Sequence, residues 1–385
     1  MPSRDEIRGW LEDNCPASMR VPGPESEDVW GGRNETFAHP DAKIWFERMR
    51  DKGWLAPTWP VDYGGAGMSD ADARVLAQQM RALRCRLPLK SFGLWMLGPV
   101  LFEYGNEEQK REHLPKIARG EIRWCQGYSE PGAGSDLASL SCRAERDGDD
   151  YVINGQKVWT SHADEADWMF CLVRTNPDAP KRDGISFILI DMATPGVTVK
   201  PIALISGSSP FCETFFEDVR VPARNVVGAL DSGWTIAKAL LQHERQLISN
   251  LRDEAAEERE SLIDTARRYG VDDPILRDRI TQVEMDFLCQ SLTVRRSAEA
   301  MKAGLGPGAE SSMFKLYGTE LNKRRKQLRV ELCGYRGLGW EGEAFSEDER
   351  RYTREWLRSR ANSIEGGTSE IQLNIIAKRV LGLPD

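Results

Sequence analysis

One carboxylate of this sequence is placed as a general base would need to be. In the segment 234–251, apolar residues such as Leu240 and Ile248 recur with a helical period. At about 100° per residue, Glu244 falls in the middle of that apolar stripe, with Arg245 at its edge. An apolar setting raises the pKa of a carboxyl group towards neutrality, which suits proton abstraction. The competing interpretation is a buried ion pair between Glu244 and a base such as Arg245.

Two further stretches have the composition of a ligand site. The stretch SEPGAGSDL combines a proline and two glycines, which let the backbone approach a ligand closely, with the hydroxyls of Ser129 and Ser135. In QKVWTS, strand alternation places Trp159 and Ser161 on one face, so that an aromatic plane lies beside a hydroxyl. Such a pair suits a flat heteroaromatic ligand. The competing interpretations are an ordinary surface turn and a core tryptophan.

Near the C-terminus, a Gly-Gly turn at 366–367 precedes a helix start. Thr368 or Ser369 can cap the helix that begins near Glu370. Free N–H groups at a capped helix start suit phosphate or carbonyl oxygens, although the residue can equally be no more than a cap. The run 315–329, KLYGTELNKRRKQLR, has six basic residues and one acidic residue. That composition is typical of a solvated helix face, and it also suits a pyrophosphate.

The elements that must position these residues follow from the periods along the chain. Up to about residue 120 the sequence is helical in pattern, with helices expected at 41–52 and 70–84 and a Pro- and Gly-rich loop between them. From about 124 to 228, short β-branched and aromatic runs predict a compact antiparallel β domain. Asn154-Gly155, between two of these runs, predicts a two-residue hairpin.

After this β region, the helical period returns at Ser232 and predicts a helix bundle. We therefore expect an α+β chain with a N-terminal helical domain at 1–123, a central antiparallel β domain at 124–228 and a C-terminal four-helix bundle at 229–385. A length of 385 residues is compatible with that number of domains.

Composition excludes several classes of protein. The 60 acidic residues outnumber the 52 basic ones, and the net charge of −8 argues against a general nucleic-acid binder. No apolar run approaches the roughly 18 residues of a membrane span, and the charged N-terminus lacks the apolar core of a secretory signal. The eight cysteines form no CxxC pair and do not cluster with the four histidines, so we expect no metal site and buried thiols in a reducing cytoplasm. The 12 tryptophans leave open both stacking on a flat ligand and core packing.

Six segments, in order along the chain, together resemble the acyl-CoA dehydrogenase family. They are WLAPTWPVDYGGAGMS, GNEEQKREHLPKIARGE, YSEPGAGSDL, DGDDYVINGQKVWTSHADEADW, FFEDVRVPARNVVG and IEGGTSEIQLNIIAKRVLGLP. The similarity looks greatest to bacterial members that act in fatty-acid or steroid side-chain breakdown. It implies an oxidoreductase that desaturates an acyl-CoA thioester between its α and β carbons, in which a glutamate takes the α-proton and FAD accepts the β-hydrogen as hydride.

The resemblance also implies cofactor positions by motif. Contacts with the flavin ring are implied for Gln126, Ser129, Trp159 and Ser161, contacts with the adenosine end for Thr368 and Glu370, and contacts with the flavin or the CoA chain for Ser135. A tetramer is implied, with an electron-transfer flavoprotein as the electron acceptor. The alternative on the same fold is a flavin oxidase or monooxygenase.

The position of the base departs from a frequent family pattern. Many members place the base two residues after the isoleucine of the C-terminal motif, where this chain has Gly366. Another branch, which includes isovaleryl-CoA dehydrogenase, places its glutamate directly before an arginine on the first long helix of the C-terminal domain. The dipeptide here is Glu244-Arg245. Glu244 is therefore the expected base on both grounds, with Glu365 as the alternative, and Arg245 and Gly366 are expected beside the substrate.

Two positions that would reach a neighbouring subunit's FAD also depart from the family. The family's R-x-x-F-G stretch is missing, and Arg279 in DPILRDRITQ is the nearest substitute. The glutamine that opens Q-x-x-G-G-x-G is replaced by Glu331 in ELCGYRG, and a carboxylate there repels phosphates unless it is screened. Some bacterial members form mixed tetramers whose two chain types share the flavin sites. This chain is thus expected either in a homotetramer or as one half of such a pair, as a half-site or non-catalytic subunit.

Overall fold

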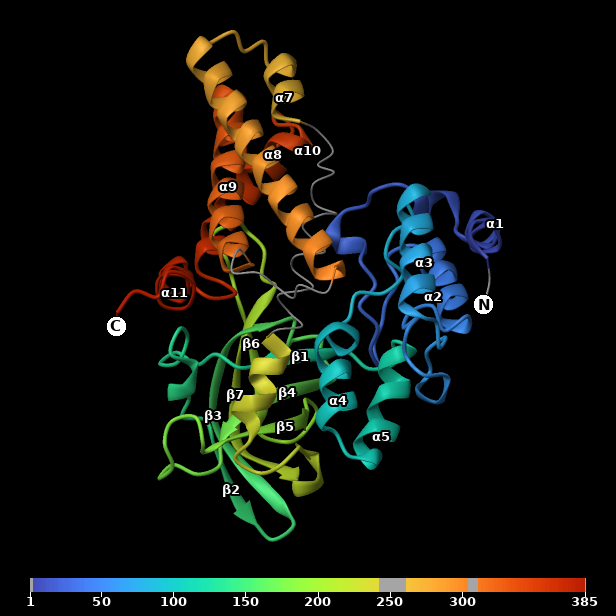
Figure 1. Ribbon diagram of the computed structural model, residues 1–385, viewed down its shortest axis with the longest axis vertical. Coiled ribbons are helices and arrows are strands. Elements are labelled where there is room, and N and C mark those ends of the chain that lie inside the picture. The colour runs from blue at the N-terminus through green and yellow to red at the C-terminus, as the bar shows by residue number, and fades with distance from the viewer. Residues whose placement is uncertain (1–2, 242–260, 304–310, 385) are drawn as a thin grey trace. The chain divides into compact units, whose positions relative to one another are not determined.

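The computed structural model describes residues 3–241, 261–303 and 311–384. The described chain divides into two compact units (Figure 1). The first unit comprises 3–202 and 210–241, and the second comprises the loop 203–209 together with 261–303 and 311–384. The first unit contains the N-terminal helices and a β-sheet and the second is helical, which confirms the predicted order of helical, β and helical segments.

The N-terminal segment of the first unit is helical (Figure 1). Its helices are α1 (Arg4–Asn14), α2 (Pro40–Asp51), α3 (Asp70–Ala82), α4 (Gly98–Tyr104) and α5 (Glu107–Ala118), with 3₁₀ turns at Ala17–Arg20, Glu25–Glu27 and Val61–Tyr63 and a π-helical turn at Gly93–Leu97. The helices predicted at 41–52 and 70–84 are confirmed as α2 and α3. Their starts are fixed locally, because the Ser69 hydroxyl caps α3 and Pro40 fits the first turn of α2.

The sheet of the first unit has eight strands in the described residues. They are β1 (Trp124–Gly127), β2 (Arg143–Asp147), β3 (Asp150–Ser161), β4 (Trp168–Arg174), β5 (Ile185–Asp191), β6 (Val197–Ile202), β7 (Phe211–Pro222) and β8 (Val226–Val227), with 3₁₀ turns at Leu137–Ser139 and Ala223–Asn225. The order across the sheet is β6-β7-β3-β2-β4-β5-β8, and β1 pairs with β4. The strand pairs are antiparallel as predicted, except that β4 runs parallel to β1 and to β2. Neither exception is joined by a hairpin, which is a connection that only antiparallel neighbours allow.

One apolar core joins the N-terminal helices to one face of this sheet. Phe170 and Leu172 on β4 and Leu189 on β5 are fully buried and belong to the same cluster as the residues of α2 and α4. The alternate residues of the same strands, such as Cys171 and Ile188, form a second cluster on the other face. Strands β4 and β5 are therefore covered on both faces, which explains their unbroken apolar sequence.

The hairpin predicted at Asn154-Gly155 is wrong. Strand β3 continues through both residues, and its register against β7 shifts just before Gly155, which marks a β-bulge. The turn lies instead at Gly148-Asp149, where a φ of 61° at Gly148 helps to join β2 to β3. Gly155 serves another purpose, because its φ is 149° and a Cβ there would lie 2.7 Å from the Cα of Cys142. Asn-Gly here marks the close approach of another backbone segment to strand β3.

We expect the substitution Gly155→Ala to destabilise the first unit. The new Cβ would clash with the Cys142 backbone at a φ that L side chains rarely adopt, so the free energy of unfolding should fall by about 2–4 kcal/mol. Gly148→Ala is the matched control, because Gly148 also has a positive φ but nothing within 4 Å of a new Cβ. Urea unfolding followed by circular dichroism measures both variants. Equal losses of stability would contradict a role for the approach to Cys142.

Acidification is expected to destabilise the first unit through His113. This side chain of α5 is buried, and its ring centroid lies 5.3 Å from that of Trp124 and 4.9 Å from that of Trp168. Burial, with a contribution from Lys116, lowers the pKa of His113 from 6.5 to about 4. The unfolded chain takes up this proton at a higher pH than the folded chain does. The free energy of unfolding therefore falls as the pH drops from 6.5 towards 4, by up to about 3 kcal/mol.

The variant His113→Phe isolates this contribution. It keeps an aromatic ring between the two tryptophans and removes the titrating group. Between about pH 7 and about pH 5, we expect wild-type protein to lose about 2 kcal/mol more stability than the variant. Urea unfolding at each pH measures the difference. Parallel stability curves for the two proteins would rule out His113 as a source of the pH dependence.

The second unit consists of helices in its described residues (Figure 1). They are α7 (Leu262–Arg268), α8 (Pro274–Lys302), α9 (Ser311–Leu332), α10 (Glu347–Ser359) and α11 (Ser369–Ile375), with 3₁₀ turns at Gly334–Leu338 and Arg360–Ser363 and a π-helical turn at Ile376–Val380. Ser346 and Glu349 cap the start of α10 reciprocally through side chain and backbone. The buried apolar cluster of this unit is Leu262, Ala266, Ile280, Val283, Leu321, Leu328 and Leu332.

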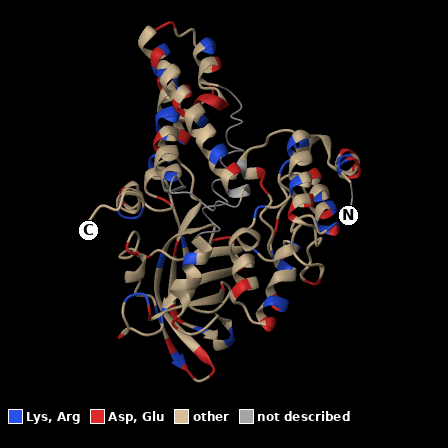
Figure 2. Cartoon of the chain, in the orientation of Figure 1, with Lys and Arg blue, Asp and Glu red and all other residues tan. Residues whose placement is uncertain are grey.

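Charged side chains supply further contacts between these helices. Figure 2 shows basic and acidic residues interspersed along the helices of the second unit. Within the basic run 315–329, Arg324 bonds Asp286 of α8 at 2.8 Å. Lys326 bonds Glu355 of α10, also at 2.8 Å. These cations of α9 are therefore neutralised by carboxylates of the two adjacent helices.

Two arginines of the same run are buried and stacked on aromatic rings. The guanidinium of Arg325 lies 5.0 Å from the ring centroid of Phe287, and that of Arg329 lies 5.2 Å from the centroid of Tyr352. Such contacts let an arginine pack inside a helical bundle. The run is therefore not the solvated helix face that its composition suggests, and its cations act mainly as links between α8, α9 and α10.

The described residues contain neither a membrane span nor a metal cluster. No helix among them is long and apolar enough to cross a bilayer. No group of three or more histidine, cysteine, aspartate and glutamate side chains among them is arranged to hold a metal ion. The eight cysteines, all of them among the described residues, are thiols and not disulfides, and six of them are buried.

Candidate functional site

The loop that carries Ser129 and Ser135 is held by backbone and side-chain bonds. A tight turn opens the loop, since Glu130 and Ala133 exchange two backbone hydrogen bonds of 3.1 and 3.0 Å. Near its end, the Arg174 guanidinium donates to two carbonyl oxygens of the loop, the shortest bond being 2.7 Å. Ser129 is half-buried, whereas Ser135 is exposed at the surface.

Trp159 is turned out of the sheet by a second β-bulge. The register between β3 and β7 shifts between Lys157 and Thr160, and Trp159 adopts a left-handed φ of 61°. Lys157 and Thr160 are both fully buried, so the strict alternation predicted for QKVWTS is wrong. Trp159 itself is 54% exposed and makes an edge contact with Phe211, at 6.0 Å between ring centroids. It presents an aromatic surface and is not a core residue.

The segments of Ser129 and Trp159 are brought together by the sheet. The Val158 N–H donates to the Ser129 carbonyl oxygen at 2.9 Å. Gln126 lies half-buried on β1, and Ser161 lies half-buried at the end of β3. The four residues expected at a flavin ring thus come from β1, from β3 and from the loop that follows β1, all within the first unit.

A buried ion pair that the sequence alone did not predict joins the same segments. Lys157 donates from its ammonium group to the Glu130 carboxylate at 2.7 Å and to the Tyr128 carbonyl oxygen at 3.2 Å. The Glu130 carboxylate also accepts from the Ser141 N–H at 2.7 Å, from the Ser141 hydroxyl at 3.0 Å and from the Cys142 N–H at 2.9 Å. The only signal in the sequence is a lysine inside an apolar strand, which is costly to bury without a partner.

Both members of this pair are charged. Burial acts to raise the pKa of Glu130, but Lys157 and the donating N–H groups hold that pKa below its ordinary value. Burial acts to lower the pKa of Lys157, but the sulfur and carboxylate groups around it raise that pKa above its ordinary value. Because both charges are buried, the ion pair is favourable only in the geometry that keeps these hydrogen bonds.

Two expected cofactor residues of the second unit bind each other. Arg279 on α8 and Glu331 on α9 form an ion pair, and the Gln327 amide donates to Glu331 at 2.9 Å. Burial acts to raise the pKa of Glu331, whereas the bonds from Arg279 and Gln327 lower it below its ordinary value. In the turn that follows, Tyr335 takes the place of the second glycine of Q-x-x-G-G-x-G and is 76% exposed. The charge of Arg279 is cancelled within the chain.

The C-terminal motif forms a turn and a helix cap. Of the two cap candidates, Thr368 is the cap, since its hydroxyl accepts from the Ile371 N–H at 3.2 Å and α11 begins at Ser369. Gly366 has a φ of 63° and is exposed, and Glu370 is exposed in the first turn of the helix. Thr368 and Glu370 therefore lie together at the start of a short helix in the second unit.

Glu365, the alternative base, already has partners for both carboxylate oxygens. One oxygen accepts from the Arg358 guanidinium at 2.8 Å, and the other accepts from the Asn362 amide at 2.6 Å. Both oxygens are therefore engaged by neighbouring side chains and are not directed at an open site. In the second unit, Glu365 therefore forms a structural ion pair with Arg358.

The preferred base, Glu244, lies outside the described residues, as does its neighbour Arg245. The helix that leads towards them is described over 233–241. Ala237 and Leu240 of this helix are buried in the first unit's core, as the predicted apolar stripe requires.

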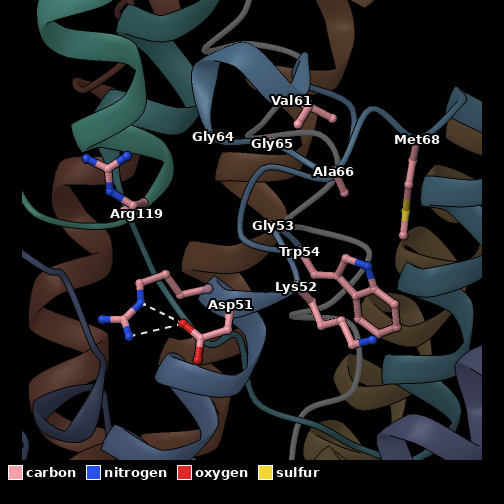
Figure 3. Close-up of a pocket in the computed structure, with 11 residues that line it drawn as sticks. Asp51, Lys52, Gly53, Trp54, Val61, Gly64, Gly65, Ala66, Met68 and Arg119 are labelled. Atoms are coloured by element: carbon pink, nitrogen blue, oxygen red, sulfur yellow. Dashed lines mark hydrogen bonds and ion pairs between the residues drawn. The ribbon is translucent and has the colours of Figure 1, made fainter.

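A hollow of about 430 Å³ lies in the N-terminal segment of the first unit (Figure 3). It is lined by Arg50, Asp51, Lys52, Gly53, Trp54, Val61, Gly64, Gly65, Ala66, Met68 and Arg119. Two of its basic groups are paired, because Arg50 bonds Asp51 and Arg119 bonds Glu121. None of the residues expected at the cofactor or the substrate lines this hollow, so it is separate from the candidate site.

Comparison with known proteins decides the family. Models of three acyl-CoA dehydrogenase domains match consecutive parts of the chain: the N-terminal domain at residues 5–121, the middle domain at 125–219 and the C-terminal domain at 231–381. The chain belongs to the acyl-CoA dehydrogenase family. Members of this family are flavoprotein oxidoreductases that act on acyl-CoA, and the six sequence segments quoted above had indicated the same family.

Individual relatives of this acyl-CoA dehydrogenase come from bacteria. The chain is 38% identical to acyl-CoA dehydrogenase IpdE1 of Mycobacterium tuberculosis, over 99% of this chain and 97% of the relative. Among solved structures it resembles the Tcur3481-Tcur3483 steroid ACAD, with a TM-score of 0.80, 30% identity and 99% and 96% of the two chains covered. It also resembles the ChsE4-ChsE5 complex of Mycobacterium tuberculosis, with a TM-score of 0.73, 30% identity and 100% and 98% covered.

The two units of this acyl-CoA dehydrogenase differ in how well their residues suit FAD. In the first unit, exposed Trp159 beside half-buried Ser129 fits a planar ring that needs an aromatic surface and polar partners at its edge. In the second unit, Arg279 is bound by Glu331, so this pair offers no net positive charge to a diphosphate. The described residues thus fit the flavin ring of the family's cofactor, but the Arg279–Glu331 pair does not fit a neighbour's diphosphate.

Proposed function

We propose that this chain catalyses the α,β-desaturation of an acyl-CoA thioester with FAD as its cofactor. When bound, FAD supplies the acceptor for the β-hydrogen, which leaves as hydride. We assign removal of the α-proton to the Glu244 carboxylate, for which the sequence pattern predicts an apolar helical face, a setting that suits a general base. The observation that carries the proposal is Trp159, held 54% exposed beside the Ser129 loop in a chain that matches the family over three domains.

The choice of Glu244 over Glu365 is supported by the partners of Glu365. A general base needs a free lone pair directed at the substrate proton. Arg358 and Asn362 each donate to one oxygen of Glu365. Glu365 would have to lose both bonds before it could act, whereas the sequence pattern predicts the Glu244 carboxylate on the apolar side of its helix.

The remaining residues divide between cofactor and substrate. We assign Gln126, Ser129, Trp159 and Ser161 to the flavin ring, Thr368 and Glu370 to the adenosine end, Ser135 to the flavin or the CoA chain, and Arg245 and Gly366 to the substrate. The first four are supported by their common place on β1, β3 and the loop between. The assignment predicts that binding of flavin protects Trp159 from solvent.

For the substrate, we infer a CoA thioester with a bulky acyl group, such as a steroid-derived side chain. The relative described as a steroid ACAD, at 30% identity over nearly the whole chain, supports this class. A base on the first long helix of the C-terminal segment, instead of the C-terminal turn, is compatible with branched or bulky acyl groups. A panel of straight, branched and steroid-derived acyl-CoAs separates these substrates.

A mixed tetramer is the second proposal, and the Arg279–Glu331 pair favours it. Because Glu331 neutralises Arg279, a second copy of this chain would offer no free cation at this position to the diphosphate of a neighbour's FAD. An unlike chain that keeps an unpaired arginine there could supply that cation. Two similar solved structures are described as paired assemblies, the ChsE4-ChsE5 complex and Tcur3481-Tcur3483. We therefore infer that an unlike chain of the same family completes the flavin site.

The experiment that tests the function uses the colour of the purified protein. We expect yellow protein, alone or with its partner chain, whose flavin band bleaches when acyl-CoA is added without oxygen. Reoxidation by an electron-transfer flavoprotein, with little reaction towards dissolved oxygen, is expected of a dehydrogenase. Rapid reoxidation by oxygen with release of peroxide would identify an oxidase instead. Protein that holds flavin but is not bleached by any acyl-CoA of the panel would contradict the proposal.

A further inference from the structure

We propose that the buried Glu130–Lys157 pair positions the flavin-binding surface of this chain, so that both are positioning residues. The proposal deepens the function proposed above and rests on it. Glu130 directly follows Ser129, and Lys157 lies two residues before Trp159. The pair therefore ties together the two segments that carry the polar and the aromatic parts of the surface, as the Val158 N–H bond to Ser129 also does.

The pair is built to hold one geometry. Lys157 is 0% exposed and Glu130 is 6% exposed. Besides Lys157, the donors to Glu130 are the backbone and hydroxyl of Ser141 and the backbone of Cys142, so the carboxylate is fixed from several directions. Any displacement of either group would leave a charge without its partner in a medium of low dielectric constant.

This fixed geometry explains why Trp159 is turned outward. In a regular strand, Lys157 and Trp159 would lie on the same face of the sheet. The ammonium group of Lys157 is bound inside by Glu130, and the hydroxyl of Thr160 is bound inside by the Cys212 carbonyl oxygen at 2.8 Å. Lys157 and Thr160 are both buried and lie three positions apart, whereas residues on one face of a regular strand are separated by an even number of positions. The bulge absorbs the extra residue, and Trp159 is left exposed.

The test uses the full chain, with its partner chain where one is required for flavin binding. The main variant is the double substitution Glu130→Gln and Lys157→Met, which removes both charges and keeps the side-chain lengths. Lys157→Met alone is the second variant, because it leaves the carboxylate without its cation. Amide hydrogen exchange of the protein without cofactor measures how well ordered residues 129–136 and 158–161 are. A titration with FAD, followed by flavin fluorescence, measures the dissociation constant of FAD.

Two control variants separate positioning from general loss of stability. Ile153→Ala removes a fully buried side chain of the same strand at a distance from the pair, and it lowers thermal stability without touching the anchors. Arg220→Met breaks the exposed ion pair of Arg220 with Asp147 at 2.6 Å, on the strand next to β3. We expect exchange in the two segments to rise about tenfold or more, and FAD affinity to fall about tenfold or more, only in the Glu130 and Lys157 variants.

Each outcome separates this proposal from the proposed function. Exchange and FAD affinity that match the Ile153→Ala control, or remain as in wild type, overturn the positioning role while leaving the function intact. Faster exchange in the two segments of a chain that binds no FAD supports the positioning of the surface and contradicts the function. A red or blue shift of the bound flavin band in the double variant, at unchanged thermal stability, supports the positioning role beyond any structural effect.

Discussion

Glutamine in place of Glu244 is expected to abolish the bleaching of bound flavin by acyl-CoA. Glutamine keeps the shape of the side chain but cannot accept the α-proton, and loss of a general base slows such a step by about 10²–10⁴-fold. Flavin content should stay as in wild type, because the residues assigned to the flavin ring lie on β1, β3 and the loop after β1. Anaerobic stopped-flow absorbance after mixing with acyl-CoA measures the rate.

The control for this experiment is Glu365→Gln. Since Glu365 is bonded to Arg358 and Asn362 at 2.8 and 2.6 Å, its loss should lower stability modestly and leave the bleaching rate within a few-fold of wild type. A Glu244→Gln variant that bleaches at the wild-type rate would remove Glu244 from the role of base. If Glu365→Gln is then the variant that fails, the assignments must be exchanged.

Glu331→Gln is expected to raise the affinity of this chain for FAD when no unlike partner is present. The substitution restores the glutamine that the family usually carries and releases the Arg279 guanidinium from its pair. A released cation near a diphosphate, together with removal of a repelling carboxylate, should tighten FAD binding by about tenfold to a hundredfold, or about 1.4–2.8 kcal/mol. Fluorescence titration of flavin-stripped protein measures the dissociation constant.

The matched control is Glu299→Gln, which removes another exposed acid of the same unit that pairs with Arg295 at 2.9 Å. It has the same change in net charge, so an equal gain in FAD affinity would trace the effect to overall charge. Unchanged affinity in Glu331→Gln would contradict the view that the Arg279–Glu331 pair prevents flavin sharing between like chains. In that case a homotetramer would remain the simpler assembly.

Local signals predicted the elements, and contacts between distant residues decided their details. Helices α2 and α3 follow from apolar period and from caps such as Ser69, all of which are read within a few residues. The turn at Asn154-Gly155 was predicted from the same kind of signal and is wrong. There the close approach of Cys142, which lies just before strand β2, requires the glycine. A dipeptide alone cannot distinguish a turn from a close strand contact.

The candidate site shows the same limit. The exposure of a tryptophan at position 159 depends on two buried anchors, Lys157 and Thr160, whose partners lie elsewhere in the sequence. Arg279 and Glu331 were each singled out from sequence, but their ion pair depends on how α8 and α9 pack. Motif spacing thus located residues of interest, and tertiary contacts determined which of them are free for a ligand.

The outward tryptophan also affects the chain before any cofactor arrives. Because the bulge is set by buried bonds, the apo protein does not need to rearrange to expose its aromatic surface. The same preorganisation leaves a large apolar ring in water for as long as the site is empty. A planar ring that binds there would therefore need no ordering of the backbone, and its affinity would not be lowered by that cost.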